Sequence, residues 1–143
     1  MHYKEFTVRT SKRRELVNIT EHVEKIVRES GMRNGIALIF VPHATAAIIA
    51  NEDEPLIRED YLWLFERIAP ENFGYSHNRI DNNADSHMLS ALFKQFYIFP
   101  IKEGELVRGR WQEIMLAEFD GPRTRRISVA VIGCDKGSQD SVH

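Results

Sequence analysis

A continuous apolar segment at residues 35–41 constrains the fold of this 143-residue chain more than any other feature of its sequence. It shows no alternation of polar and apolar residues and is rich in β-branched and aromatic side chains. This pattern predicts a β-strand that is covered on both faces. We therefore expect the segment at the centre of a sheet.

Five further segments have the pattern of strands. Residues 3–10 and 16–19 are expected to pair with each other, while residues 96–101, 111–119 and 126–132 predict a β-meander near the end of the chain. Turns at Gly104 and at residues 120–122 separate the strands of the meander.

Three segments predict helices. The first follows Thr20 and stops at Gly31, and the second begins at Pro55 and keeps a 3.6-residue rhythm as far as Pro70, with Asp60 near its middle. The third covers about 85–95 and places His87 in its first turn. Residues 71–83 read as a polar loop, and residues 43–50 predict another strand on which His43 and Thr45 share a face.

These elements predict a single α+β domain over residues 1–143, with a frayed tail after about residue 134. The net charge of −2 gives no positive field that could hold a nucleic acid, and no apolar segment approaches the ~20 residues that cross a bilayer. Cys134 is the only cysteine, which excludes an internal disulfide and fits a reducing compartment. We expect a cytoplasmic protein.

Three histidines, His43, His77 and His87, are the main candidates for chemistry. They are expected at a strand end, in a polar loop and at a helix start, and their spacing matches no zinc motif. The alternative is three histidines that are separately satisfied or exposed. The positive end of a helix disfavours imidazolium at His87, and its backbone N–H groups could also bind a phosphate.

Acidic and basic side chains supply possible partners for these histidines. The candidate carboxylates, each of which could instead be a surface charge or a helix cap, are Glu52, Asp60, Asp81 and Asp85. Strand alternation places Arg123 and Arg125 on one face and Arg126 on the other, so at most two of these guanidinium groups can converge on one ligand. Trp111 is expected in the core.

Six short segments, in this order, resemble those of the YjbQ family: residues 42–46, 51–52, 75–77, 81–87, 109–112 and 120–123. The resemblance extends from about Phe6 to Gly133. It implies an α+β fold of β-sheet and helix layers, with mostly antiparallel or mixed strands, that assembles as a homotrimer and has its polar site near the subunit boundaries. It also implies an activity like that of thiamine-phosphate synthase.

By this resemblance, His43, His77 and His87 fall on the family's histidine positions, and its other recurring polar positions are Glu52, Asp60, Asn83, Gln112, Asp120 and Arg123. The residues expected to carry catalysis are His43, His77, His87, Asp81 and Glu52. The positions that contact substrate or phosphate are Arg123, Asn83, Gln112, Asp120 and Thr45. The same three histidines are the candidate ligands of a divalent metal ion, zinc, magnesium or manganese. Ala44 and Asn82 depart from the family pattern and remove one hydroxyl and one possible charge from the site.

Three functions follow from these positions. The first joins an aminopyrimidine diphosphate to a thiazole phosphate and releases diphosphate, with Arg123 and the His87 helix end binding phosphate. The second is metal-assisted hydrolysis of a small phosphorylated or acylated metabolite. The third is a trimeric module that binds a small anion without catalysis. In each case the expected partners are a small phosphorylated metabolite and two further copies of the chain.

Overall fold

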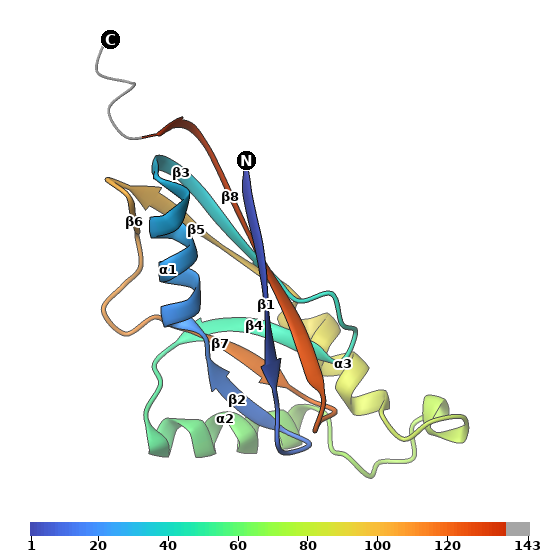
Figure 1. Cartoon of the computed structure of the whole chain (residues 1–143). Helices are drawn as coiled ribbons and strands as arrows, with labels where there is room; N and C mark the ends of the chain where they lie inside the picture. Colours follow the sequence, from blue (N-terminus) through green and yellow to red (C-terminus); the bar gives the residue numbers. More distant parts are fainter. Residues whose placement is uncertain (137–143) are drawn as a thin grey trace.

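The protein is an α+β fold built from two antiparallel sheets and the helices around them (Figure 1). The computed structural model describes residues 1–136. Within them, the first sheet contains, in spatial order, β1 (His2–Arg9), β8 (Thr124–Lys136), β3 (Met32–Phe40), β5 (Phe96–Lys102) and β6 (Glu105–Leu106). The second sheet contains β2 (Glu15–Asn18), β7 (Glu113–Glu118) and β4 (Ala46–Asn51). The helices are α1 (Thr20–Ser30), α2 (Pro55–Ile68), the short 3-10 helix η1 (Ser76–Arg79) and α3 (Ala84–Phe93).

The second sheet lies between two hydrophobic layers. Leu116 of β7 faces the first sheet and α1, where it joins a core that includes Ile39 and Val23. Its neighbour Met115 faces the opposite way and packs with Phe65 of α2. Because successive side chains of a strand point to opposite faces, the buried run of β7 supplies both layers at once. Figure 1 shows α2 beneath this sheet and α1 on its other side.

The predicted helices form with their ends close to the expected positions. In α1, Val23, Ile26 and Val27 form the buried face, and Gly31 takes the left-handed conformation with φ of 70°. In α2, Pro55 is the first residue, and the Glu54 carboxylate accepts hydrogen bonds from the backbone N–H groups of the first turn. Within residues 1–136, no helix has the length and apolar character needed to cross a bilayer.

The prediction of a central strand is confirmed, whereas the predicted coverage of its two faces is wrong. β3 is the middle strand of the first sheet, but Ile36 and Phe40 on its outer face are each 39% exposed. The strand that is covered on both faces is β7, because the second sheet, and not the first, is the inner layer.

The predicted strand partners are also wrong. β1 pairs with β8 and β2 with β7, so the first two strands belong to different sheets. The expected meander is interrupted in the same way, because β5 and β8 both flank β3 while β7 lies in the second sheet. β8 continues through residue 136, and the rest of the predicted frayed tail, 137–143, lies outside the described residues.

A buried ion pair joins the two sheets at one end. Glu118 at the end of β7 and Arg125 near the start of β8 are 0% and 2% exposed. Arg125 Nε donates to Glu118 Oε1 at 2.9 Å, and a second Arg125 nitrogen contacts Glu118 Oε2. Thr10 Oγ1 also donates to the carboxylate, while the Thr45 hydroxyl accepts from Arg125 at 2.8 Å. Both charges therefore have polar partners although they are removed from water.

We predict that Glu118→Leu lowers the free energy of unfolding by about 3–5 kcal/mol, because it leaves the Arg125 guanidinium buried without its counter-charge. The double variant Glu118→Leu/Arg125→Met is expected to lose much less, since no lone charge remains. Denaturant titration followed by circular dichroism measures both. A loss below about 1 kcal/mol in the single variant would contradict a structural role for the pair.

Candidate functional site

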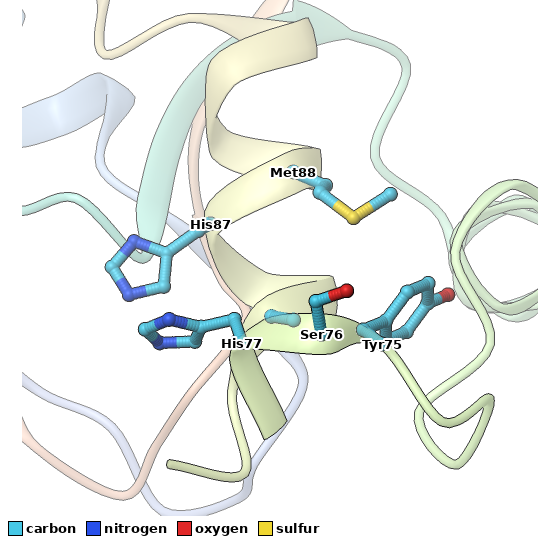
Figure 2. A pocket seen from close by; sticks show the side chains of 6 residues that line it. Tyr75, Ser76, His77, His87 and Met88 are labelled. Atoms are coloured by element: carbon cyan, nitrogen blue, oxygen red, sulfur yellow. The ribbon is translucent and has the colours of Figure 1, made fainter. Parts of the chain in front are cut away.

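Two histidines line the same cavity beside the start of α3. The rings of His77 in η1 and His87 in α3 lie 5.2 Å apart, centre to centre, and nearly perpendicular at 81°. Figure 2 shows the His87 ring above that of His77, with Ser76, Tyr75 and Met88 on the other side of α3 in this view. All five residues line the cavity. Together with Ala84, these residues line an open cavity of about 480 Å³, a volume typical of a small-molecule site.

A chain of hydrogen bonds runs from His77 to an exposed arginine. His77 Nε2 lies 3.1 Å from Asn83 Oδ1, and Asn83 Nδ2 donates to Asp120 Oδ2 at 3.1 Å. Arg123 donates to the same Asp120 oxygen at 2.9 Å, and its Nε donates to the Asp120 carbonyl at 2.7 Å. The structure thus brings together four of the predicted site residues, and His87 lies beside them.

Two arginines that the sequence reasoning did not select hold this region in place. Asp85 in the first turn of α3 is fully buried, and Arg13 donates to both of its carboxylate oxygens at 2.9 and 3.0 Å. Arg14 donates to Asp85 Oδ2 at 2.8 Å. Burial raises the pKa of Asp85, but these hydrogen bonds outweigh it and hold that pKa below its usual range. The run of basic residues at 12–14, in the turn between β1 and β2, is the sequence feature that could have indicated these two arginines.

The start of α3 offers less to a phosphate than the sequence predicts. The backbone N–H of Ala84 already donates to Asn78 Oδ1 at 3.1 Å. Those of Ser86 and His87 donate to the carbonyl of Asn83. The helix dipole still favours an anion here, whereas most of the hydrogen-bonding capacity of this helix end is occupied.

His43 and Thr45 lie in the connection between β3 and β4, and the strand predicted for them begins only at Ala46. His43 Nε2 accepts a hydrogen bond from the backbone N–H of Arg126 at 3.1 Å. Burial lowers the pKa of His43, and the nearby positive charges of Arg125 and Arg126 lower it further. Thr45 is buried against Arg125, so its hydroxyl serves the ion pair between the sheets.

Other predicted site residues lie elsewhere. Glu52 directly follows Asn51, and Gln112 directly precedes Glu113. Asn51 and Glu113 are paired at one end of the second sheet, and Glu118 lies at the other end. The length of β7, roughly 17 Å at the usual rise of a strand, separates Glu52 and Gln112 from the ion pair. Asp81 is exposed, and its carboxylate accepts from the neighbouring backbone N–H at 2.7 Å.

Two smaller expectations at this opposite end are also corrected. Trp111 is 62% exposed and lies beneath the Arg110 guanidinium, so its predicted place in the core is wrong. The strand predicted to begin at residue 111 begins only at Glu113, so Arg110 and Trp111 precede β7. Gln112 Oε1 instead accepts from the Gly109 N–H and closes a local turn.

The donors of one chain do not fit the predicted metal centre. Within residues 1–136, no group of three or more histidine, cysteine, aspartate or glutamate side chains is arranged to hold a metal ion. Within one chain, His77 and His87 lie next to each other, whereas His43 Nε2 already accepts a hydrogen bond from the backbone N–H of Arg126. Binding of zinc, magnesium or manganese stays a prediction, and the chemistry proposed below does not use it.

Residues 4–134 match the family described as UPF0047 protein YjbQ-like. The chain belongs to this family. A UPF0047 protein of Archaeoglobus fulgidus is 41% identical over 90% of this chain and 99% of its own length. A UPF0047 protein of Methanothermobacter thermautotrophicus is 44% identical over 91% of each chain.

Solved structures agree with this assignment. A crystal structure described as a YbjQ-like protein of unknown function from Sulfolobus solfataricus is 45% identical, with a TM-score of 0.91, over 92% of this chain and 96% of that one. A YjbQ/UPF0047 protein of Clostridium acetobutylicum is 35% identical, with a TM-score of 0.85, over 90% and 99% of the two chains.

These comparisons overturn the predicted thiamine-phosphate synthase activity. None of these relatives carries that activity in its name, and the Sulfolobus protein is described as one of unknown function. The geometry gives a physical reason for the error, because Glu52 and Gln112 do not converge with the histidine pair in one chain. The assignment as a transferase of this kind is wrong.

We predict that His43 makes the protein less stable in mild acid. Its pKa is lowered in the folded state, so below about 6.5, the ordinary value, the unfolded chain takes up a proton that the folded chain resists. The contribution of His43 to stability should therefore be constant above about pH 6.5 and should decrease as the pH drops below that value. Denaturant unfolding of the wild type and His43→Gln at pH 8, 6.5 and 5.5 measures this difference. A constant gap between the two proteins across this range would show that His43 is not responsible.

Proposed function

We propose that the cavity of His77 and His87 binds a small phosphorylated metabolite and that the histidine pair exchanges protons with it. The observation that carries this proposal is the placement of two imidazole rings 5.2 Å apart on the wall of one cavity. Imidazole is the side chain whose charge changes closest to neutral pH, so such a pair is suited to general acid–base chemistry.

Arg123 is the proposed phosphate donor. Its side chain is 52% exposed, and its bonds to Asp120 engage Nε and one terminal nitrogen. A guanidinium carries five N–H donors, so others remain for a ligand. The hydrogen-bonded chain that begins at His77 ends at this arginine, which supports placing the phosphate near the histidines.

The rest of the ligand is proposed to be apolar and compact. Tyr75, Ala84 and Met88 line the cavity beside the histidines, and a thioether adapts readily to differing shapes. The Tyr75 hydroxyl donates to the Pro70 carbonyl at 2.9 Å, and burial and Asp85 raise the pKa of this phenol. Tyr75 therefore contributes an uncharged ring to the wall.

Binding and turnover can be separated experimentally. We would titrate phenyl phosphate, which has an apolar ring and a phosphate group, into the wild type and the His77→Gln and His87→Gln variants by calorimetry. Incubation with a panel of phosphorylated metabolites, followed by mass spectrometry, would detect conversion. Binding with conversion that both variants lose supports the proposal, binding without conversion leaves a binding protein, and no binding to any of them overturns it.

We predict that Arg123→Ala weakens phenyl phosphate binding by about ten- to a hundredfold, the usual cost of losing charge-assisted hydrogen bonds. Arg123→Lys should recover only part of the affinity, because an ammonium lacks the planar fork. Arg126→Ala is the matched control, since its guanidinium is similarly exposed but lies 3.8 Å from Glu5 on the outer face of the sheet. Each variant is first checked to be folded and in the same oligomeric state as the wild type. Equal affinities in the three variants would remove Arg123 from the site.

We also propose that the protein forms a homotrimer through the outer face of the first sheet. Exposed apolar side chains of adjacent strands meet there, since Ile36 is paired with Ile132 and Phe40 with Phe96. Ile98, which is 47% exposed, continues the same face on β5. Contiguous apolar surface of this kind usually marks an interface. Coverage by a second copy would give β3 the two buried faces that its sequence favours.

Light scattering should give about three times the 16.6 kDa of one chain. We predict that Ile98→Glu dissociates the assembly, because a carboxylate in the centre of an apolar interface costs several kcal/mol. Trp63→Glu is the control, since Trp63 is 61% exposed on α2 and lies outside the proposed interface. A monomeric wild type, or a trimer that survives Ile98→Glu unchanged, would contradict this surface as the interface.

A cytoplasmic location is also proposed. The single cysteine supports a reducing compartment, because it leaves no internal disulfide to stabilise the chain.

A further inference from the structure

Asn83 and Asp120, two positions that the sequence reasoning assigned to phosphate, are occupied with each other and with His77. Asn83 Nδ2 lies 3.1 Å from Asp120 Oδ2, and Asn83 Oδ1 lies 3.1 Å from His77 Nε2. Asn83 is 7% exposed and the side chain of Asp120 is 12% exposed. Neither polar group is well placed to be the main contact of a ligand.

The direction of each hydrogen bond follows from the chemistry of the groups. Asp120 Oδ2 also accepts from Arg123, whose guanidinium can only donate. An oxygen in this role is an acceptor, so the Asn83 atom that faces it must be the NH₂ group. The carbonyl oxygen of the same amide then faces His77, and a carbonyl oxygen can only accept. The proton between Asn83 and His77 must therefore belong to His77 Nε2.

We infer that Asn83 and Asp120 are positioning residues that hold His77 as the Nε2–H tautomer. In the neutral ring the lone pair is then on Nδ1, which makes Nδ1 the atom able to accept a proton. Figure 2 shows the His87 ring directed toward the His77 ring from above. The tautomer is a property of the protein alone, whereas the role of Nδ1 as the base for a phosphorylated substrate rests on the proposed function.

An asparagine at position 83 has a specific consequence. Its amide has a donor and an acceptor, so it can connect an accepting carboxylate to a donating ring. A carboxylate in its place would accept from His77 directly and would favour the charged imidazolium. The amide thus passes on the orientation that Asp120 sets without placing a negative charge beside the ring.

Asp120 is itself fixed from two sides. Arg123 donates to Oδ2, and Arg13 Nε lies 3.9 Å from Oδ1. The backbone N–H of Asp120 donates to Glu118 Oε2 at 3.0 Å, which ties this turn to the ion pair between the sheets. The orientation of His77 is therefore anchored in the buried part of the fold.

The test uses ¹⁵N-histidine-labelled protein without ligand, at a pH where His77 is neutral. Long-range ¹H–¹⁵N spectra distinguish the protonated ring nitrogen from the one that carries the lone pair. We expect His77 of the wild type to be entirely the Nε2–H form. Because an unrestrained neutral imidazole is a mixture that already favours this form, the variants decide the question.

In Asp120→Ala the Asn83 amide can turn over and present its NH₂ group to His77, so a fraction of the Nδ1–H form should appear. Asn83→Ala should give the mixture of an unrestrained ring, whereas Asn83→Asp, whose carboxylate can only accept, should keep the Nε2–H form. Asn82→Ala is the matched control, because its exposed side chain lies outside this chain of bonds and only its carbonyl contacts Arg13. The spectrum of His87 reports whether the pocket remains folded.

The Nδ1–H form in the wild type, or an unchanged His77 spectrum in Asp120→Ala and Asn83→Ala, would overturn the inference. Failure of phenyl phosphate to bind would overturn the proposed function and leave the tautomer result standing. The two ideas therefore fail in different experiments.

Discussion

The rest of the molecule depends on the ion pair between Glu118 and Arg125, because it joins the two sheets where the site is built. The carboxylate takes hydrogen bonds from Thr10 and from the backbone of Asp120, and the guanidinium reaches Thr45. Three segments that are distant in the sequence, at Thr10, at Thr45 and at residues 118–125, thus meet at one buried charge pair. Such a pair contributes little net stability when compared with apolar packing, but it imposes strict geometry, because any displacement leaves a charge without a partner. The candidate site is linked to this fixed point through Asp120, whose backbone contacts Glu118 and whose side chain contacts Asn83.

The order of the layers explains which surfaces remain available. The second sheet is filled on both faces, by the first sheet and α1 on one side and by α2 and α3 on the other. Within one chain, only the inner face of the first sheet is covered. Apolar side chains therefore stay exposed on its outer face, whereas those of the second sheet are buried on both faces. The histidine cavity lies outside both hydrophobic cores. It is formed by η1 and the start of α3, beside the turn that follows β7. The stable layers and the site are therefore built from different parts of the sequence.

Periodicity and local chemistry predicted much of this fold, and the long-range contacts account for most of what was missed. Pro55 and Gly31 act within a few residues of themselves, so the helix ends that they mark could be predicted. The partners of β1 and β2 depend on residues about a hundred positions away, and no local pattern encodes that choice. The same limit applies to the site. His77, Asn83 and His87 are close in the sequence, so their motif could be recognised. The length of β7 separates Glu52 and Gln112 from the ion pair, and this separation could not be predicted from the sequence.

The position of the ion pair in the sequence has a consequence for how the chain folds. Glu118 and Arg125 lie in different sheets, but they are only seven positions apart in the sequence. Closing so short a loop costs little conformational entropy, whereas most strand pairings here must first close long stretches of chain. The connection between the two layers can therefore form before either layer is complete. The turn at residues 119–123 would then act as an early template on which β1, β3 and β4 assemble.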